Sequence, residues 1–310
     1  MRVCFDSRPA ADRRGIGRHA RSLLASLVDE AQRRGGEIVE GRHPRRHDDV
    51  FHAPWMAGAL LRPRVPMVVT VHDLVQQKRP GEHLRAGLRG GMRHLALARA
   101  TRLIVPTHAV AADAEEILGV SAERIDVIAE AAASSFSPRS AQEVASVRER
   151  YGVPGPDYLL WVGDLRHPDP HRRVTALIDA PRELPLVLAG PAGQWARELP
   201  GVILTGDVDD DDLAALYTGA RALLLPSQDE GFGLPAVEAL ACGTPVVASA
   251  GPSLREVLAG RATFVEAGDV PGLVAAAHTV QRPAPAPPSW TWDDAARTTW
   301  DVYERALSGA

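Results

Sequence analysis

The chain is poor in cysteine and has no long apolar run. Among its 310 residues only Cys4 and Cys242 are cysteines, and they lie far apart in the sequence. This usage argues against a disulfide framework and fits the reduced thiols of a cytoplasmic protein. The N-terminus does not resemble a signal peptide, and no apolar stretch is long enough to span a bilayer. We therefore expect a soluble protein in the cytoplasm.

Lysine is nearly absent, and the charges are unevenly spread. Lys78 is the only lysine, so almost every cation is an arginine. Residues 1–100 hold 19 Lys and Arg against 10 Asp and Glu, whereas the remainder holds 16 against 29. A basic N-terminal part suits an anionic partner, such as a membrane surface or a phosphate-bearing acceptor. The alternative is an ordinary solvated surface. We expect no nucleic-acid partner.

The order of apolar segments indicates an α/β protein. A length of 310 residues favours two domains. Buried-strand runs alternate with helical patterns and lack strict polar alternation, which predicts parallel sheets with helices on both faces. The expected strands are residues 2–5, 50–55, 65–71, 101–105, 125–129, 158–162, 186–189, 202–205, 222–225, 246–248 and 262–265. The expected helices are residues 18–28, 107–118, 141–151, 209–217, 236–241, 253–258 and 290–307, with a Pro-rich linker at 281–289.

The stretch 226–249 is the most informative part of the sequence. It predicts a glycine turn after one strand, a short helix, and then the next strand. Gly231 and Gly233 flank Phe232 and free the backbone to approach a ligand. Pro235 suits the first turn of the helix, and Gly243 ends it.

Two acids belong to this stretch, Glu230 in the turn and Glu238 in the helix. A helix N-terminus carries unpaired N–H groups and partial positive charge, so it attracts phosphate. A nearby carboxylate accepts hydrogen bonds from sugar hydroxyls, at about 1.5–3 kcal/mol for each charge-assisted bond. The stretch can therefore hold a polyol and a diphosphate together. The alternative is that both only complement the helix dipole.

This stretch resembles the signature of the retaining GT-B glycosyltransferases of family GT4. The matching residues are Glu230-Gly231-Phe232-Gly233-Leu234-Pro235, Glu238-Ala239 and Gly243-Thr244-Pro245-Val246-Val247. The resemblance implies two Rossmann-like domains that face a central cleft. The first would comprise residues 1–138, with the helix at 290–310 packing back onto it. The second, residues 139–289, would bind the nucleotide sugar. The implied reaction transfers a hexose to a hydroxyl with retained configuration.

The resemblance also implies roles for single residues. Glu230 would contact the sugar and Glu238 the ribose, while backbone N–H groups from Gly231 through Phe232 and Gly233 to Leu234 would hold the diphosphate. The base would lie near Val208.

In the first domain, Gly15 and Gly17 would approach the donor phosphates or the acceptor, unless they form a plain strand-to-helix turn. His72 would lie near the sugar and acceptor, unless it only caps a strand end. His52 is a further candidate.

Two segments depart from the family pattern. Gly163-Asp164-Leu165 resembles the family's second glycine turn, but no lysine follows it. Arg166, Arg172 or Arg173 would then hold the donor diphosphate. Glu130-Ala131 stands where the family usually has Asn-Gly. The aspartates at 209–212 suit helix capping better than metal binding, and we expect neither a protein-held metal nor a cofactor.

Other functions remain compatible with the same residues. The missing lysine favours a non-catalytic sugar-nucleotide-binding partner subunit, and a GT-B epimerase or phosphorylase would share the architecture. The Gly-Ile-Gly-Arg loop and the His-Asp-Leu segment resemble bacterial O-antigen mannosyltransferases, which favours GDP-mannose as the donor. The acceptor would be a glycan, a glycolipid or a small molecule. The sequence names neither the acceptor nor the oligomeric state.

Overall fold

The chain forms two compact units. The computed structural model describes all residues except 13–14, 76, 79–89 and 310. One unit combines Met1–Glu130 with Trp290–Ala310, and the other is Ala131–Ser289. The division falls directly after Glu130, eight residues before the predicted boundary. Residues 131–138 therefore belong to the second unit, where Phe136 packs edge-on against Tyr217 with 5.9 Å between ring centroids.

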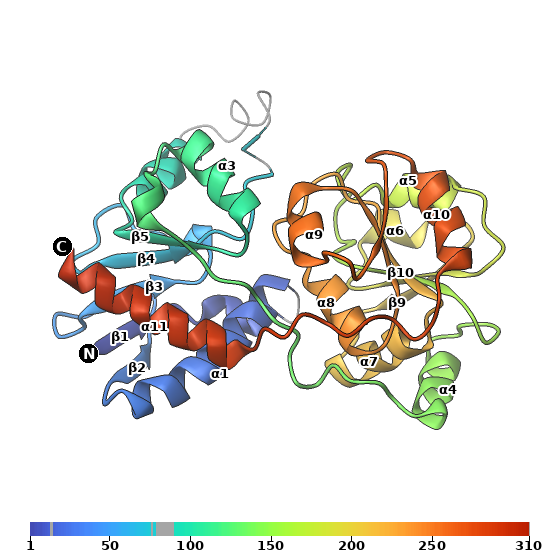
Figure 1. Cartoon of the computed structure of the whole chain (residues 1–310), viewed down its shortest axis with the longest axis horizontal. Coiled ribbons are helices and arrows are strands. Elements are labelled where there is room, and N and C mark those ends of the chain that lie inside the picture. The colour runs from blue at the N-terminus through green and yellow to red at the C-terminus, as the bar shows by residue number, and fades with distance from the viewer. Residues whose placement is uncertain (13–14, 76, 79–89, 310) are drawn as a thin grey trace. The chain divides into compact units, whose positions relative to one another are not determined.

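The first unit is built on a six-stranded sheet with the order β2-β1-β3-β4-β5-β6 (Figure 1). All five neighbouring pairs are parallel, as predicted. The strands are β1 (Arg2–Phe5), β2 (Glu37–Glu40), β3 (Val50–Ala53), β4 (Met67–Thr70), β5 (Arg102–Val105) and β6 (Ile125–Val127). The sequence did not predict β2, because only Ile38 and Val39 between two glutamates are apolar, and the strand lies at the sheet edge.

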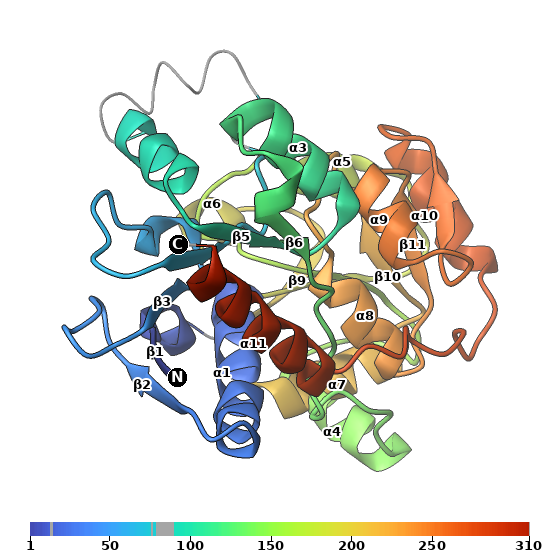
Figure 2. The same ribbon diagram turned by 60° about the vertical axis from the view of Figure 1, so that its left-hand side comes forward.

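Helices cover both faces of this sheet. Helix α1 (Gly15–Arg33) packs along α11 (Trp292–Ser308), and Figures 1 and 2 both show the two side by side. Helix α3 (His108–Leu118) covers the opposite face together with the helical residues 90–98. Successive strand residues point to opposite faces, so Phe51 joins the cluster under α3 while its neighbour His52 bonds to Tyr303 of α11.

Both ends of α3 follow the predicted capping. The Thr107 side chain accepts a hydrogen bond from the backbone N–H of Val110. Gly119 ends the helix in the left-handed region at φ 64°. The short helices η1 (Arg8–Ala11), η2 (Met56–Gly58) and η3 (Ala122–Arg124) complete the assigned elements of this unit.

The second unit contains another parallel sheet of six strands, with the order β12-β11-β10-β7-β8-β9. Its strands are β7 (Leu159–Val162), β8 (Leu186–Ala189), β9 (Val202–Gly206), β10 (Ala222–Leu225), β11 (Val246–Ser249) and β12 (Thr263–Val265). Its helices are α4 (Ala141–Arg150), α5 (Val174–Asp179), α6 (Gln194–Arg197), α7 (Asp210–Gly219), α8 (Leu234–Ala241), α9 (Pro252–Val257) and α10 (Val270–Thr279). The sequence did not predict α5, α6 or α10.

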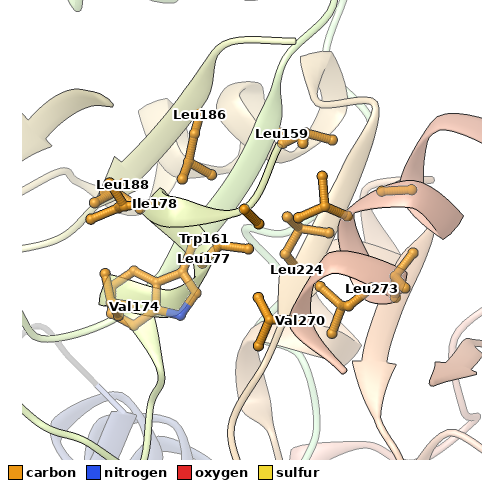
Figure 3. Packing of buried hydrophobic residues seen from close by; sticks show 14 of the residues in the cluster. Leu159, Trp161, Val174, Leu177, Ile178, Leu186, Leu188, Leu224, Val270 and Leu273 are labelled. Atoms are coloured by element: carbon orange, nitrogen blue, oxygen red, sulfur yellow. The ribbon is translucent and has the colours of Figure 1, made fainter. Parts of the chain in front are cut away.

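One core cluster joins β7, β8 and β10 to α5 and α10 (Figure 3). Trp161 lies in this cluster and is 1% exposed. The strand order reverses between β7 and β10, which are neighbours in the sheet although two strands and three helices separate them in sequence. In doubly wound sheets, ligands bind at the carboxyl ends of the strands at such a switch. The segment after β10 is the 226–233 turn, and the segment after β7 begins at Gly163.

The two cysteines are free and buried, so the predicted absence of a disulfide is confirmed. Among the described residues, no helix combines the length and apolar character needed to cross a membrane.

Helix α1 begins at the first glycine of the N-terminal loop, three residues earlier than predicted. A Cβ on Gly17 would overlap the carbonyl oxygen of Asp12 and approach that of Pro9, because the helix packs directly on this backbone. A Cβ on Gly15 would meet nothing within 4 Å. Gly17 is therefore required for packing, whereas Gly15 is not.

We expect Gly17→Ala and Gly15→Ala to differ in their effect on the free energy of unfolding. Gly15→Ala should stabilise α1 or leave it unchanged, since alanine is favoured over glycine in helices by up to about 1 kcal/mol. Gly17→Ala should destabilise the protein, since backbone must move to admit the methyl group. Urea unfolding followed by circular dichroism measures both. Equal effects of the two substitutions would contradict this packing.

Candidate functional site

The turn after β10 leads the chain into α8 through a left-handed residue. Gly233 has φ 88° and precedes the first helical residue. A Cβ there would come within 2.6 Å of the Cδ2 atom of Leu254. Glycine therefore suits this position for both conformation and space. The N-cap residue of α8, Gly233, makes no side-chain capping bond. Pro235 has no N–H, and the N–H of Ala236 donates to the carbonyl of Gly233 over 2.8 Å, so the first turn can offer an anion only its remaining N–H groups.

The apolar residues of the turn are anchors. Phe232 is 4% exposed and Leu234 is 6% exposed, so their side chains belong to the core. What this segment can offer a ligand is mainly the backbone from Gly231 to Leu234. That arrangement suits a diphosphate, which accepts hydrogen bonds from successive N–H groups.

The two acids of the signature differ in burial. Glu230 lies in the turn and is partly exposed. Glu238 is fully buried on α8, where its carboxylate accepts a 3.0 Å hydrogen bond from the Tyr217 hydroxyl. Contact between Glu238 and a ribose stays a prediction, and it requires movement of the side chains that cover the carboxylate.

The loop after β7 lies against the signature turn. The backbone N–H of Gln228 donates to the carbonyl of His171 over 3.1 Å. Arg173 has φ 50°, precedes α5, and donates to the carbonyl of Gly268 over 3.3 Å. The Gln228 amide faces the same guanidinium, and the orientation with its oxygen toward Arg173 satisfies both groups. The structure thus brings Arg173 to the turn.

The other two candidate arginines have acidic partners of their own. Arg166 bonds to Asp164, with its Nη2 3.0 Å from the carboxylate. Arg172 lies 3.4 Å from the Asp169 carboxylate, and its guanidinium extends over Gly163. Arg172 therefore lies at the carboxyl end of β7, whereas Arg166 is exposed and held within the loop.

The aspartates at 209–212 cap α7, as predicted. Asp209 accepts from the N–H of Asp212 over 2.8 Å, and the next three aspartates occupy the first turn. The Asp212 carboxylate is bound by Arg150 and by the Tyr151 hydroxyl. Val208 directly precedes this cap and is 8% exposed. Its predicted contact with a base stays a prediction.

His52 is a core residue of the first unit. Its Nδ1 lies 2.6 Å from the Tyr303 hydroxyl and its Nε2 lies 2.9 Å from the Thr70 hydroxyl. Burial lowers the pKa of His52 to about 3, so the ring is neutral. The ring joins β3 and β4 to α11 and has no nitrogen left for a ligand.

His72 belongs to a buried cluster that sequence reasoning missed. Its Nδ1 lies 2.9 Å from Oε1 of Glu130, and its Nε2 lies 3.0 Å from the carbonyl oxygen of Pro54. Nδ1 of His19, from α1, lies 3.2 Å from the same Glu130 oxygen. The sequence feature that could have indicated this cluster is Glu130, an acid at a position where the family usually has asparagine.

The three ligand atoms of this cluster lie within 4.8 Å of one another, a spacing that a metal ion could bridge. The sequence does not predict such a group, because its members come from three distant segments. The paired charges also stabilise each other without an ion. The two histidines and their hydrogen bonds lower the pKa of Glu130 to about 2, against the effect of its burial.

We expect charge reversal to separate the arginines of the β7 loop. Arg173→Glu should weaken nucleoside diphosphate binding by about 1.5–3 kcal/mol and leave nucleoside binding nearly unchanged, because only the diphosphate loses a charged partner. Arg172→Glu should do the same to a smaller extent, and Arg166→Glu should resemble the exposed control Arg197→Glu. Calorimetry measures each affinity. If no variant distinguishes the two ligands, this loop does not bind the diphosphate.

Two family models match the chain. The model described as "Glycosyltransferase Family 4" covers residues 41–131, and the model "Glycosyl transferases group 1" covers residues 156–282. The first match ends next to Glu130, and the second contains both glycine turns of the second unit.

Curated relatives and solved structures agree with these matches. The chain is 28% identical over 270 residues to O-antigen chain mannosyltransferase B of Escherichia coli, across 77% of this chain and 68% of the relative. It is 30% identical over 303 residues to D-inositol 3-phosphate glycosyltransferase of Kineococcus radiotolerans, across 84% of this chain and 67% of the relative.

The fold is similar to that of Anabaena HepE in complex with UDP and glucose, with a TM-score of 0.70 and 17% identity, across 100% of this chain and 96% of that chain. It is also similar to WaaG, a glycosyltransferase involved in lipopolysaccharide biosynthesis, with a TM-score of 0.64, 15% identity, and coverage of 99% and 98%. The chain therefore belongs to the group 1, family 4 glycosyltransferases and has the GT-B fold.

Proposed function

We propose that the protein is a retaining hexosyltransferase that moves a hexose from a nucleoside-diphosphate sugar to a hydroxyl group. The acceptor belongs to a glycan, a glycolipid or a related small molecule. The observation that carries this proposal is the turn at Gly233, which directs an uncapped helix N-terminus toward the carboxyl ends of β7 and β10. An arginine at the neighbouring loop supplies a second positive group.

The chemistry of the leaving group explains this arrangement. When the bond between the sugar and the diphosphate breaks, negative charge grows on the diphosphate. Fixed N–H groups of α8 and the Arg173 guanidinium stabilise that charge without having to reorganise. Glu230, at the start of the turn, accepts hydrogen bonds from the sugar, and Glu238 receives the ribose once its covering side chains move. A donor phosphate oxygen takes the acceptor proton.

Mannose from GDP-mannose is our favoured donor. The support is the Gly-Ile-Gly-Arg loop, the His-Asp-Leu segment, and relatives named as O-antigen mannosyltransferases. Other relatives are named as inositol phosphate glycosyltransferases, and structural neighbours contain UDP or UDP-glucose. Thermal-shift screening of GDP, UDP and their sugars selects among these donors, because a bound ligand raises the melting temperature by mass action.

A non-catalytic sugar-nucleotide-binding subunit is the second candidate. It is favoured by the β7 loop, which has no lysine and whose Arg166 is engaged by Asp164. Such a subunit would bind the nucleotide sugar but would neither transfer nor hydrolyse it. An epimerase would instead change the sugar without any acceptor.

We expect turnover with retained anomeric configuration, and we expect it to depend on Glu230. Proton NMR of the product gives the anomer, and release of the nucleoside diphosphate gives the rate. Glu230→Gln should lower kcat/KM roughly 10- to 150-fold. This corresponds to about 1.5–3 kcal/mol of lost transition-state stabilisation, because a charged acceptor of sugar hydrogen bonds is removed. Glu266→Gln, an exposed carboxylate in the same unit, is the matched control.

An inverted product, or equal rates for the two variants, would contradict this assignment. Nucleotide-sugar binding with no transfer and no hydrolysis would instead identify the non-catalytic subunit.

Turnover should survive removal of divalent metal ions. The helix N-terminus and Arg173 already provide positive charge at the diphosphate, so no Mg²⁺ or Mn²⁺ is needed there. The measurement is the initial rate after dialysis against EDTA, compared with the rate after Mg²⁺ or Mn²⁺ is added back. A rate that is abolished by EDTA and restored by either ion would refute this account of the site.

A further inference from the structure

The hydrogen bonds of His72 fix the number of protons on its ring. The carbonyl oxygen of Pro54, 3.0 Å from Nε2, can only accept a hydrogen bond, so Nε2 must carry a proton. A neutral imidazole would then have a lone pair on Nδ1. That lone pair would face Oε1 of Glu130 at 2.9 Å. Two acceptors at this distance repel each other, so a proton must also lie between Nδ1 and Glu130.

Other charged groups around the ring leave Glu130 as its main partner. His19 of α1 packs edge-on against His72 with 4.5 Å between ring centroids, and burial beside His72 lowers the pKa of His19. His52 of β3 is neutral for the same reason. Asp73, next in the chain, favours a proton on His72 but acts less strongly than Glu130. The pKa of His72 is raised despite burial, chiefly by its hydrogen bond and charge interaction with Glu130.

We propose that Glu130 is a positioning residue that holds His72 as a fixed imidazolium, so that His72 serves the transfer reaction as a positive charge and not as a proton acceptor. The effect of His72 on turnover rests on the proposed glycosyl transfer, whereas the protonation of its ring does not. The ring is held at both nitrogens by groups of its own unit, and its side chain is 13% exposed. What it offers a substrate is therefore the charge of the ring, with no basic nitrogen.

The cluster also ties together the ends of several elements. Pro54 follows β3, His72 follows β4, and Glu130 follows β6. His19 brings in α1, and its ring packs against Trp292 of α11 with 5.3 Å between centroids. A carboxylate that is 95% buried is stable only when paired, and here one pair joins three strand ends. Glu130 at the position of the family's asparagine thus has a physical role.

The pair predicts a defined pH window for its contribution to stability. Because the folded pKa of His72 is raised, its contribution is complete below the ordinary value of 6.5 and is lost as pH rises through the folded value. Because the folded pKa of Glu130 is lowered, its contribution is present above 4.5 and is lost as pH falls toward about 2. His19 acts in the opposite direction to His72, since its buried neutral ring disfavours protonation as pH falls below 6.5.

Nitrogen-15 NMR of the histidine rings in the full chain tests the proposal without any assay of function. The His72 signals are assigned by their loss in His72→Asn. At pH 7.5, about one unit above the ordinary pKa of histidine, both nitrogens of His72 should show imidazolium shifts. In Glu130→Gln the Nδ1 signal should become that of an unprotonated nitrogen, because an amide can donate to it. Glu123→Gln, an exposed site in the same unit, should change neither signal.

Turnover as a function of pH then tests the consequence. The wild-type rate should vary less than about twofold between pH 6 and 8, whereas the Glu130→Gln rate should fall about tenfold per pH unit above the lowered pKa of His72. Nucleoside diphosphate affinity should stay within twofold, because the residues that hold the diphosphate lie in the other unit.

A neutral His72 in the wild-type NMR spectrum at pH 7.5 overturns the proposal, whatever the enzyme does. So does metal analysis that finds one ion per chain which is lost in both His19→Ala and Glu130→Gln, because that ion would replace the proton. Imidazolium signals in a protein that transfers no sugar would leave Glu130 as the partner of His72 and would refute the proposed function instead.

Discussion

The proposed donor site depends on the left-handed turn at Gly233. Its φ of 88° turns the chain from the end of β10 into α8 within a few residues. The space that a side chain would fill is already taken by Leu254, which also packs in the core. The buried side chains of Phe232 and Leu234 fix the turn to the core. The N-cap residue Gly233 makes no side-chain capping bond, which leaves the positive end of the α8 dipole for a ligand.

The parallel sheet decides which loops can cooperate with this turn. Because β7 and β10 are neighbours, the loops that follow them emerge at one edge of the sheet. The two loops are joined by the hydrogen bond from the backbone N–H of Gln228 to the carbonyl of His171. The Arg173 guanidinium donates to the carbonyl of Gly268. In the first unit the same rule gathers Pro54, His72 and Glu130 at the ends of three strands. There the His72 ring is held between Glu130 and the carbonyl oxygen of Pro54.

Local signals predicted much of this structure. The 226–249 stretch, the caps at Thr107 and Gly119, and the aspartate cap of α7 all involve residues within a few positions of each other, so the sequence displays them directly. His72 and Glu130 are 58 residues apart in the sequence, and His19 is farther still, so only the folded sheet brings the three together. Gly17 packs closely on the carbonyl of Asp12, a contact that sequence spacing alone cannot distinguish from a close approach to phosphate. His52 looked like a site residue because its burial under α11 depends on a helix at the far end of the chain.

Hydrogen–deuterium exchange on the full chain, with and without a nucleoside diphosphate, tests the donor site most directly. Our account predicts slower exchange on binding in peptides that cover residues 228–236, where backbone N–H groups would donate to phosphate, and in peptides that cover residues 166–173. Calorimetry on the same sample establishes that the nucleotide is bound. If the bound nucleotide leaves the exchange of residues 228–236 unchanged, the turn at Gly233 does not hold the diphosphate, and the account of the donor site is wrong.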